Sequence, residues 1–226
     1  MTLNSFMPVK LITGAGCVRA SAKELAKLGK TCLIVTGKSA ARKSGALQDV
    51  TDTLDGNGQK WLLFDEIGQN PKLTDCMAAA RKAIEAGADF ILGIGGGSAL
   101  DAAKCIAVLA ANPGLTQQQL YAFDWASKPL KIVAVGTTAG TGSEITCVSV
   151  LSDHELGVKK PLVSDAFYPT LALVDPELTY SVPRHITACT GMDVFCHSVE
   201  AYWNRNHQPV CDALAVHALR LVLENL

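Results

Sequence analysis

The hydrophobic positions along the chain alternate between strand-like and helical spacing from residue 18 onward. Short runs of consecutive apolar residues are separated by segments in which apolar residues recur every three or four positions, and several of these segments end at glycine. The predicted strands are 31–36, 61–64, 90–94, 131–135 and 171–174, and the predicted helices are 18–28, one ending near Leu54, 73–86 and 99–111. This alternation predicts an α/β fold with a doubly wound, Rossmann-like parallel sheet.

Two segments depart from this alternation. Apolar stretches on both sides of Ser152–Gly157 predict a β-hairpin between residues 145 and 163. Beyond residue 180 the pattern is helical, so we expect an α/β domain over 1–180 and the first helices of an all-helical domain over 181–226. The last predicted helix, 210–226, lacks a glycine or proline stop signal, so we expect this second domain to be incomplete.

Composition and charge narrow the class of protein. Hydrophobic residues make up 49% of the 226 residues, but no apolar run reaches the roughly 20 residues of a membrane span. The formal net charge of −1, with acids and bases interspersed, gives no basic surface for nucleic acid or an anionic membrane. The eight cysteines include no Cys-x-x-Cys pair and follow no secretory leader, which favours free thiols. We therefore expect a cytoplasmic protein that acts on a small molecule.

A glycine-rich segment, Gly93–Ser98, lies between a predicted strand and a predicted helix. Glycine lets the backbone approach a ligand closely, and the N–H groups of a helix N-terminus favour an anion. The spacing is neither the Rossmann fingerprint nor a P-loop, because Ser98 stands where each pattern has glycine. The segment favours a phosphate site, with a tight packing turn as the alternative.

A second segment of this kind, Gly136–Ser143, also follows a predicted strand. Its hydroxyl and amide groups suit pyrophosphate or ribose oxygens. Alone it would more often be a solvated polar loop. Two such loops at the carboxyl ends of strands together suit a dinucleotide.

One carboxylate and one histidine share the predicted helical region. Asp193 and His197 are four residues apart, so we expect both on one helix face. A carboxylate oxygen and an imidazole nitrogen suit Fe²⁺ or Zn²⁺, although two ligands do not complete a site. In the structural alternative, Thr190 caps the helix, Asp193 favours its positive end and His197 is merely packed.

Four motifs in a fixed order point to a known family. They are Gly95–Lys104, Thr137–Glu144, Val174–Thr179 and Thr187–Tyr202. In this order they resemble the iron-dependent (group III) alcohol dehydrogenases over nearly the whole chain, and most closely the group that includes lactaldehyde reductase and ethanolamine-utilisation dehydrogenases. The resemblance implies a dehydroquinate synthase-like architecture, a dinucleotide-binding first domain and a metal-binding helical second domain. It also implies an oxidoreductase that interconverts a small primary alcohol and its aldehyde with NAD or NADP.

The same resemblance implies a set of site residues. Cofactor contacts would come from Gly95, Gly96, Gly97, Ser98, Asp101, Thr137, Thr138, Thr141 and Thr146, with Asn70, Lys159 and Leu178 as further neighbours. Asp193 and His197 would be two metal ligands, and the family's two further histidine ligands would lie downstream of this chain. We therefore expect this chain alone to bind Fe²⁺ or Zn²⁺ poorly and to turn over little. For the full-length form we expect a homodimer.

One position bears on the choice of cofactor. The predicted strand ending at Thr36 is followed by Gly37, where NAD-preferring members of the family commonly carry an aspartate. That aspartate would hold the adenosine ribose and repel a 2′-phosphate. Gly37, followed by Lys38 and Ser39, leaves NADP open beside NAD.

Two other functions stay open at this point. A glycerol dehydrogenase or dehydroquinate synthase relative would share the architecture, although the loop from Thr137 and the segment 193–197 favour the alcohol dehydrogenase branch. A nonenzymatic nucleotide-binding fragment of such an enzyme is the second alternative. A steady change in nicotinamide absorbance with simple alcohols would distinguish the enzymes.

Overall fold

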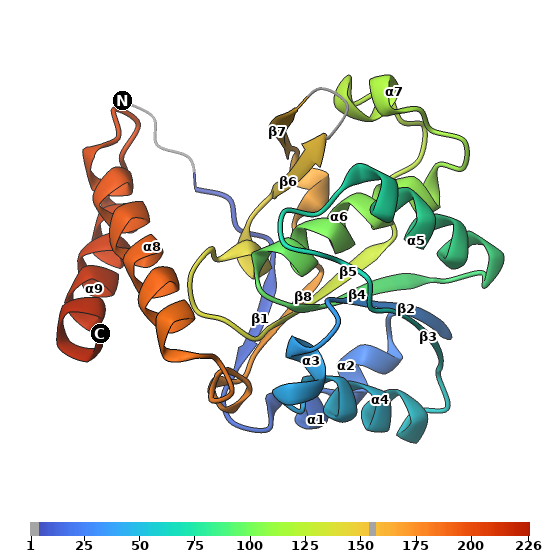
Figure 1. Cartoon of the computed structure of the whole chain (residues 1–226), viewed down its shortest axis with the longest axis horizontal. Coiled ribbons are helices and arrows are strands. Elements are labelled where there is room, and N and C mark those ends of the chain that lie inside the picture. Colours follow the sequence, from blue (N-terminus) through green and yellow to red (C-terminus); the bar gives the residue numbers. More distant parts are fainter. Residues whose placement is uncertain (1–4, 154–156) are drawn as a thin grey trace.

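Six parallel strands form one sheet between two layers of helices (Figure 1). The structure is a computed structural model that describes residues 5–153 and 157–226. The strand order is β1-β8-β5-β4-β2-β3. The strands are β1 (Lys10–Thr13), β2 (Thr31–Thr36), β3 (Lys60–Phe64), β4 (Phe90–Gly95), β5 (Lys131–Gly136) and β8 (Leu171–Val174). The parallel pairing confirms the predicted doubly wound α/β fold.

Alternate side chains of the strands enter two separate hydrophobic clusters, one on each face of the sheet. In β2, Leu33 and Val35 pack on one face, whereas Cys32 and Ile34 pack on the other. The first face is covered by α5 (Leu73–Glu85), α6 (Gly97–Ala111) and α7 (Gln117–Tyr121). The second face is covered by α1 (Cys17–Ala20), α2 (Ala22–Ala26), α3 (Ala40–Lys43) and α4 (Ala46–Gly56). Because both faces are covered, the central strands are almost entirely apolar.

The most buried helix is α6. It packs on the sheet, on α5 and on an antiparallel hairpin of β6 (Val148–Asp153) and β7 (Val158–Val163). The predicted hairpin is therefore confirmed, although residues 154–156 of its turn lie outside the described residues. With neighbours on three sides, α6 is buried around most of its circumference, Lys104 included.

Two of the expected elements differ in the structure. The single helix expected over 18–28 is wrong, because two short helices, α1 and α2, meet at the buried Ser21, whose hydroxyl donates to the Cys17 carbonyl at 2.7 Å. The helix before Gly56 is also divided, since Gly45 adopts a left-handed φ of 82° between α3 and α4. The edge strand β1 was not predicted, and three of its four residues are exposed.

The direction in which successive strands are added to the sheet reverses between the neighbouring strands β2 and β4. The connection from β2 to β3 runs through α3 and α4 on one face, whereas that from β4 to β5 runs through α6 on the other. Neighbouring strands with connections on opposite faces leave a crevice at their carboxyl ends, where open α/β sheets bind ligands. In this chain Gly37 follows β2 and Gly96 follows β4, so both lie at this crevice.

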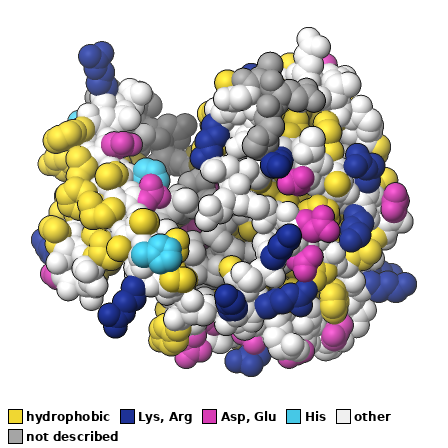
Figure 2. Space-filling model, in the orientation of Figure 1, with side chains coloured by type: hydrophobic (Ala, Val, Ile, Leu, Met, Phe, Trp, Pro, Cys, Tyr) yellow, Lys and Arg dark blue, Asp and Glu magenta, His cyan; other side chains and the backbone are white. Residues whose placement is uncertain are grey.

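Two long helices, α8 (Arg184–Trp203) and α9 (Pro209–Asn225), pack on one another beside the sheet (Figure 1). None of the described helices is both long and apolar enough to cross a membrane. Hydrophobic side chains gather on the outer surface of this pair (Figure 2), and Trp203 and Leu223 are the most exposed of them, at 80% and 76%. The division into domains at residue 180 stays a prediction.

Candidate active site

The two glycine-rich loops lie directly against each other. Gly95 at the end of β4 pairs with Gly136 at the end of β5. A Cβ on Gly96 would lie 2.8 Å from the Thr138 hydroxyl oxygen, and one on Gly97 would lie 2.9 Å from the Thr141 side chain. Glycine is required at both positions because any side chain would push the loops apart. The structure thus brings together the two loops that the sequence predicted as suited to a dinucleotide.

The N-terminus of α6 opens at the same place. Its N-cap residue is Gly96, which has no side chain to accept from the first-turn N–H groups. The neighbouring Ser98 hydroxyl accepts a hydrogen bond from the Asn70 N–H at 3.3 Å, and Asn70 adopts a left-handed φ of 54°. The predicted residues Asn70 and Ser98 therefore meet at the helix end, where an anion is favoured by the helix dipole.

The Thr137 side chain offers a direct test of whether a ligand fits between the loops. Thr137 is 2% exposed, and its hydroxyl oxygen is buried without a hydrogen-bond partner in the described part of the chain. A buried hydroxyl without a partner costs about 1–3 kcal/mol. A polar ligand group beside β5 would remove this cost, so the residues present fit the ribose or phosphate oxygens of a dinucleotide.

A buried ion pair ties the second loop to α6. The Lys104 ammonium donates to Ser143 Oγ at 2.9 Å, to Thr146 Oγ1 at 3.2 Å and to the Val148 carbonyl at 2.7 Å. The Asp101 carboxylate lies 3.9 Å from Lys104 Nζ. Because an ammonium has three donors and no acceptor, these three oxygens use its full capacity.

The Asp101 carboxylate is held from two sides. Its oxygens accept from the Ser143 hydroxyl at 2.6 Å and from the Val150 N–H at 3.0 Å. Burial raises the pKa of Asp101 above its usual value, and the bonds from Ser143 and Val150 partly offset this. Burial also lowers the pKa of Lys104 from its usual 10.5 to about 8, an effect that the attraction of Asp101 only partly offsets. Asp101 was expected as a cofactor contact, and here its carboxylate binds within the protein.

The helix α8 faces the second loop across a cleft of about 590 Å³. His197, Val194 and Ser198 of α8 line one wall, and Thr141 and Thr146 line the opposite wall. The loop approaches α8 closely, since a Cβ on Gly140 would lie 2.9 Å from the Thr190 Cβ. Thr190 lies inside α8, which begins after Pro183, so the capping role considered for it is wrong.

The two proposed metal ligands lie on one face of α8, as their spacing predicted. His197 Nδ1 and Asp193 Oδ2 are 3.7 Å apart, with side-chain exposures of 54% and 41%. An imidazole nitrogen and a carboxylate oxygen at this separation could both bind one divalent cation, so they fit half of a four-ligand site. Within residues 5–153 and 157–226, no third histidine, cysteine, aspartate or glutamate joins them.

The remaining predicted residues occupy different surroundings. Gly37 follows β2 at the crevice, where an added Cβ would lie 3.0 Å from the Ile67 carbonyl oxygen. Lys159 is exposed on β7 and lies near enough to Asp101 to lower its pKa. Leu178 is 3% exposed within the hydrophobic cluster of α1–α4, so little of its side chain is open to a ligand.

Sequence reasoning did not assign a role to Lys104 or Ser143. One signal was present, because Lys104 is the single charged residue in the otherwise apolar stretch 102–109. A lone lysine in a helix that is apolar all round indicates a buried partner. Its partners come from a loop about 40 residues later, which no local pattern reveals.

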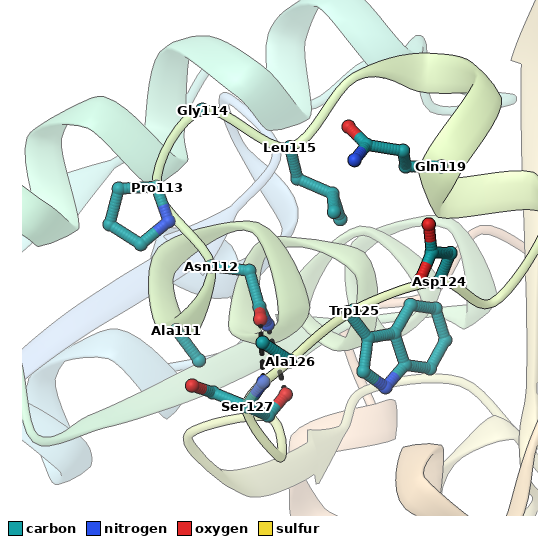
Figure 3. A pocket seen from close by; sticks show the side chains of 10 residues that line it. All are labelled: Ala111, Asn112, Pro113, Gly114, Leu115, Gln119, Asp124, Trp125, Ala126 and Ser127. Carbon is teal, nitrogen blue, oxygen red and sulfur yellow. Dashed lines mark hydrogen bonds between the residues drawn. The ribbon is translucent and has the colours of Figure 1, made fainter.

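A second cavity, of about 450 Å³, lies beyond the C-terminus of α6 (Figure 3). Two of its lining residues are joined by a pair of hydrogen bonds: the Asn112 side chain accepts from the Ser127 N–H at 2.8 Å and donates to the Ser127 carbonyl at 3.0 Å. Trp125 and Gln119 stand at its side. None of the predicted site residues lines this cavity.

Comparison with known families gives two matches. Residues 8–176 match the family of iron-containing alcohol dehydrogenases, and residues 187–226 match the C-terminal part of the Fe-containing alcohol dehydrogenase family.

Similar proteins cover almost all of this chain. The sulfoacetaldehyde reductase of Bilophila wadsworthia is 36% identical over 219 residues, which are 96% of this chain and 56% of that protein. The NAD-dependent methanol dehydrogenase of Bacillus methanolicus is 34% identical over 99% of this chain and 58% of that protein. This chain therefore spans little more than half the length of these relatives.

Solved structures agree with this comparison. An iron-containing alcohol dehydrogenase from Thermotoga maritima superimposes with a TM-score of 0.94 at 36% identity, over 99% of this chain and 62% of that one. The sulfoacetaldehyde reductase from Bifidobacterium kashiwanohense, solved in complex with NAD⁺, gives a TM-score of 0.90 at 39% identity, over 99% of this chain and 59% of that one.

Proposed function

Since the chain belongs to the iron-containing alcohol dehydrogenase family, we propose that it forms the nucleotide-binding part, and half of the metal site, of an NAD(P)-dependent oxidoreductase. The reaction is the interconversion of a small primary alcohol and its aldehyde. The observation that carries the proposal is one shared cleft: Thr141 of the second glycine loop and Thr146 just after it face His197 of α8 across this cleft. A nucleotide held by the loops and a metal held by α8 would meet in this space.

The two loops and α6 bind and orient the dinucleotide. The uncapped first turn of α6, at Gly97 and Ser98, presents N–H groups to the pyrophosphate. The unpaired Thr137 hydroxyl can donate one further hydrogen bond to a pyrophosphate oxygen, or exchange one with a ribose hydroxyl. Packing of the loops on one another keeps these groups in place before the ligand arrives, which lowers the entropic cost of binding.

Asp193 and His197 of α8 would hold the divalent metal ion, and His197 lines the cleft wall opposite Thr146. When bound, such an ion supplies Lewis-acid polarisation of the alcohol or aldehyde oxygen. The side chains of this chain orient the reactants, and Ile145, Val194 and Leu214 make much of the cleft wall apolar. Reactants held in near contact favour hydride transfer.

Calorimetric titration of the chain with NAD and with NADP tests this proposal. The titrations are made anaerobically, with and without Fe²⁺ or Zn²⁺. We expect saturable binding of a nucleotide that does not depend on the metal, because the described residues supply only two donors for it. We also expect little or no oxidation of simple alcohols by this chain. Failure to bind either nucleotide would contradict the proposal.

We also propose a cytoplasmic location and a homodimer for the full-length form. The formal net charge of −1 and the interspersed acids and bases support partners other than nucleic acid or anionic membranes. Sedimentation of the full-length protein would give its subunit number, and a monomer at all concentrations would contradict the dimer.

Replacing Gly37 with aspartate should change the preference between the two nucleotides. A carboxylate at the end of β2 would repel a 2′-phosphate and accept hydrogen bonds from a ribose. We expect Gly37→Asp to weaken NADP relative to NAD by about tenfold or more, equivalent to about 1.4 kcal/mol. The measurement is the pair of dissociation constants by calorimetry.

The matched control is Gly37→Ala. Alanine places the same Cβ 3.0 Å from the Ile67 carbonyl oxygen but adds no charge. It should affect both nucleotides equally. If the alanine and aspartate variants have the same ratio of NADP to NAD affinity, Gly37 does not lie beside the adenosine ribose.

A further inference from the structure

Lys104 cannot touch a ligand, although it lies behind the wall of the cleft. Its side chain is 0% exposed, and its three donors are already used by Ser143, Thr146 and Val148. Any influence on a nucleotide must therefore pass through one of these partners. Of the three, Thr146 lines the cleft opposite His197.

The direction of the hydrogen bonds in this network follows from the chemistry of the ammonium. Lysine in its charged form has no acceptor, so the Thr146 hydroxyl oxygen must accept from it. The Ser143 hydroxyl also accepts a hydrogen bond from Lys104 and donates one to the Asp101 carboxylate. The Thr146 hydroxyl has no such acceptor among the described residues, so its hydrogen is left for a ligand.

We propose that Lys104 is a positioning residue, whose ammonium orients the Thr146 hydroxyl to donate across the cleft to a carbonyl oxygen of the ligand, such as the nicotinamide carboxamide. This inference rests on the proposed function, because it needs a nucleotide whose nicotinamide end lies beside His197. It assigns Asp101 the matching role of holding the ammonium in place through Ser143 and its own charge.

Loss of the proton from Lys104 would reverse this arrangement. A neutral amine can accept a hydrogen bond, so Thr146 could then donate to Nζ and not to the ligand. The titratable and charged groups that face Lys104 are Asp101 on its own helix, Glu144 in the turn after the second loop, and Cys147 just before β6, while Lys159 of β7 acts on Asp101.

The sign of the pH dependence follows from these contacts. Burial lowers the pKa of Lys104 to about 8 in the folded protein without ligand. If the ligand favours the protonated form, affinity is full below that pKa and is lost as the pH rises through it. A group with a pKa of about 8 goes from mostly protonated at about pH 7 to mostly neutral at about pH 9, so affinity should fall by up to about tenfold.

The test is calorimetric titration with the nucleotide that the wild-type chain binds better, at about pH 7 and about pH 9. Four further chains are compared with wild type: Thr146→Val, Thr146→Ser, Lys104→Met and the exposed-lysine control Lys23→Met. We expect wild type, Thr146→Ser and Lys23→Met to lose affinity with rising pH. We expect Thr146→Val and Lys104→Met to bind about tenfold more weakly at the lower pH and to show no further loss.

Two results would overturn the positioning role of Lys104, and a third would overturn the proposed function as well. A flat wild-type profile, or a Thr146→Val profile as steep as that of wild type, overturns the positioning role while leaving nucleotide binding in place. If wild type binds no nucleotide, the proposed function fails and this inference fails with it. If Lys104→Met does not fold, as judged by circular dichroism, the wild-type, valine and serine profiles still decide, because titration of the ligand itself is common to all of them.

Discussion

Replacing Gly97 with valine is expected to lower the affinity of the chain for its nucleotide by about 100-fold or more, equivalent to about 2.7 kcal/mol. The first atom of the new side chain would already lie 2.9 Å from Thr141 Cγ2 and Oγ1. The rest of the valine would separate the two loops and cover the first-turn N–H groups of α6. Calorimetry with NAD and NADP gives the measurement.

The control for this substitution is Gly56→Val at the end of α4. Gly56 has no atom within 4 Å of an added Cβ and lies outside both loops, so the variant should bind like wild type. Circular dichroism must show that Gly97→Val stays folded. A folded Gly97→Val chain with wild-type affinity would mean that the nucleotide does not approach this loop.

Replacing Asp101 with alanine is expected to destabilise the fold by about 3–5 kcal/mol, because it leaves a buried ammonium without its counter-charge. The two side chains are 14% and 0% exposed, so solvent cannot screen the remaining charge. The Ser143 hydroxyl and the Val150 N–H would lose their acceptor as well. Urea unfolding followed by circular dichroism measures the change.

Two further variants separate the buried charge from other effects of truncation. The double variant with Asp101→Ala and Lys104→Met removes both charges and should recover part of the loss, since the buried pair gains little over neutral side chains. Asp65→Ala breaks the exposed 2.9 Å pair with Arg42 and should cost only about 0–1 kcal/mol. Equal losses for Asp101→Ala and Asp65→Ala would show that the buried pair does not hold the loop.

The sheet and its central helices could be predicted from the sequence because their signals are local. The inner strands β2, β4, β5 and β8 carry apolar runs because they are covered on both faces, the edge strand β3 also has the apolar run 61–64, and α5 and α6 show clear helical spacing. The strand β1 lacked such a run because it lies at the sheet edge beside β8 with most of its side chains exposed. The division of α1 from α2 falls at the buried Ser21, whose hydroxyl donates to the Cys17 carbonyl, and the local apolar spacing does not show it.

The site residues that could be predicted from the sequence are those that belong to short local motifs. The glycine loops predicted from the sequence pack on one another in the structure, and Thr141 of the second loop lines a cleft whose opposite wall includes His197, four residues after Asp193 on α8. The partners of Lys104 could not be found in this way, because they are acceptors supplied by a distant turn and a backbone carbonyl. The close approach of Gly96 to Thr138 and of Gly97 to Thr141 is also a tertiary contact that no local pattern reveals.

The most direct test of the proposed nucleotide site is a crystal structure of the chain with NADH or NADPH bound. We expect the pyrophosphate within hydrogen-bond distance of the N–H groups of Gly97 and Ser98, and the nicotinamide in the cleft between Thr146 and His197. A nucleotide bound elsewhere, for instance in the cavity beside Asn112 and Trp125, would contradict it.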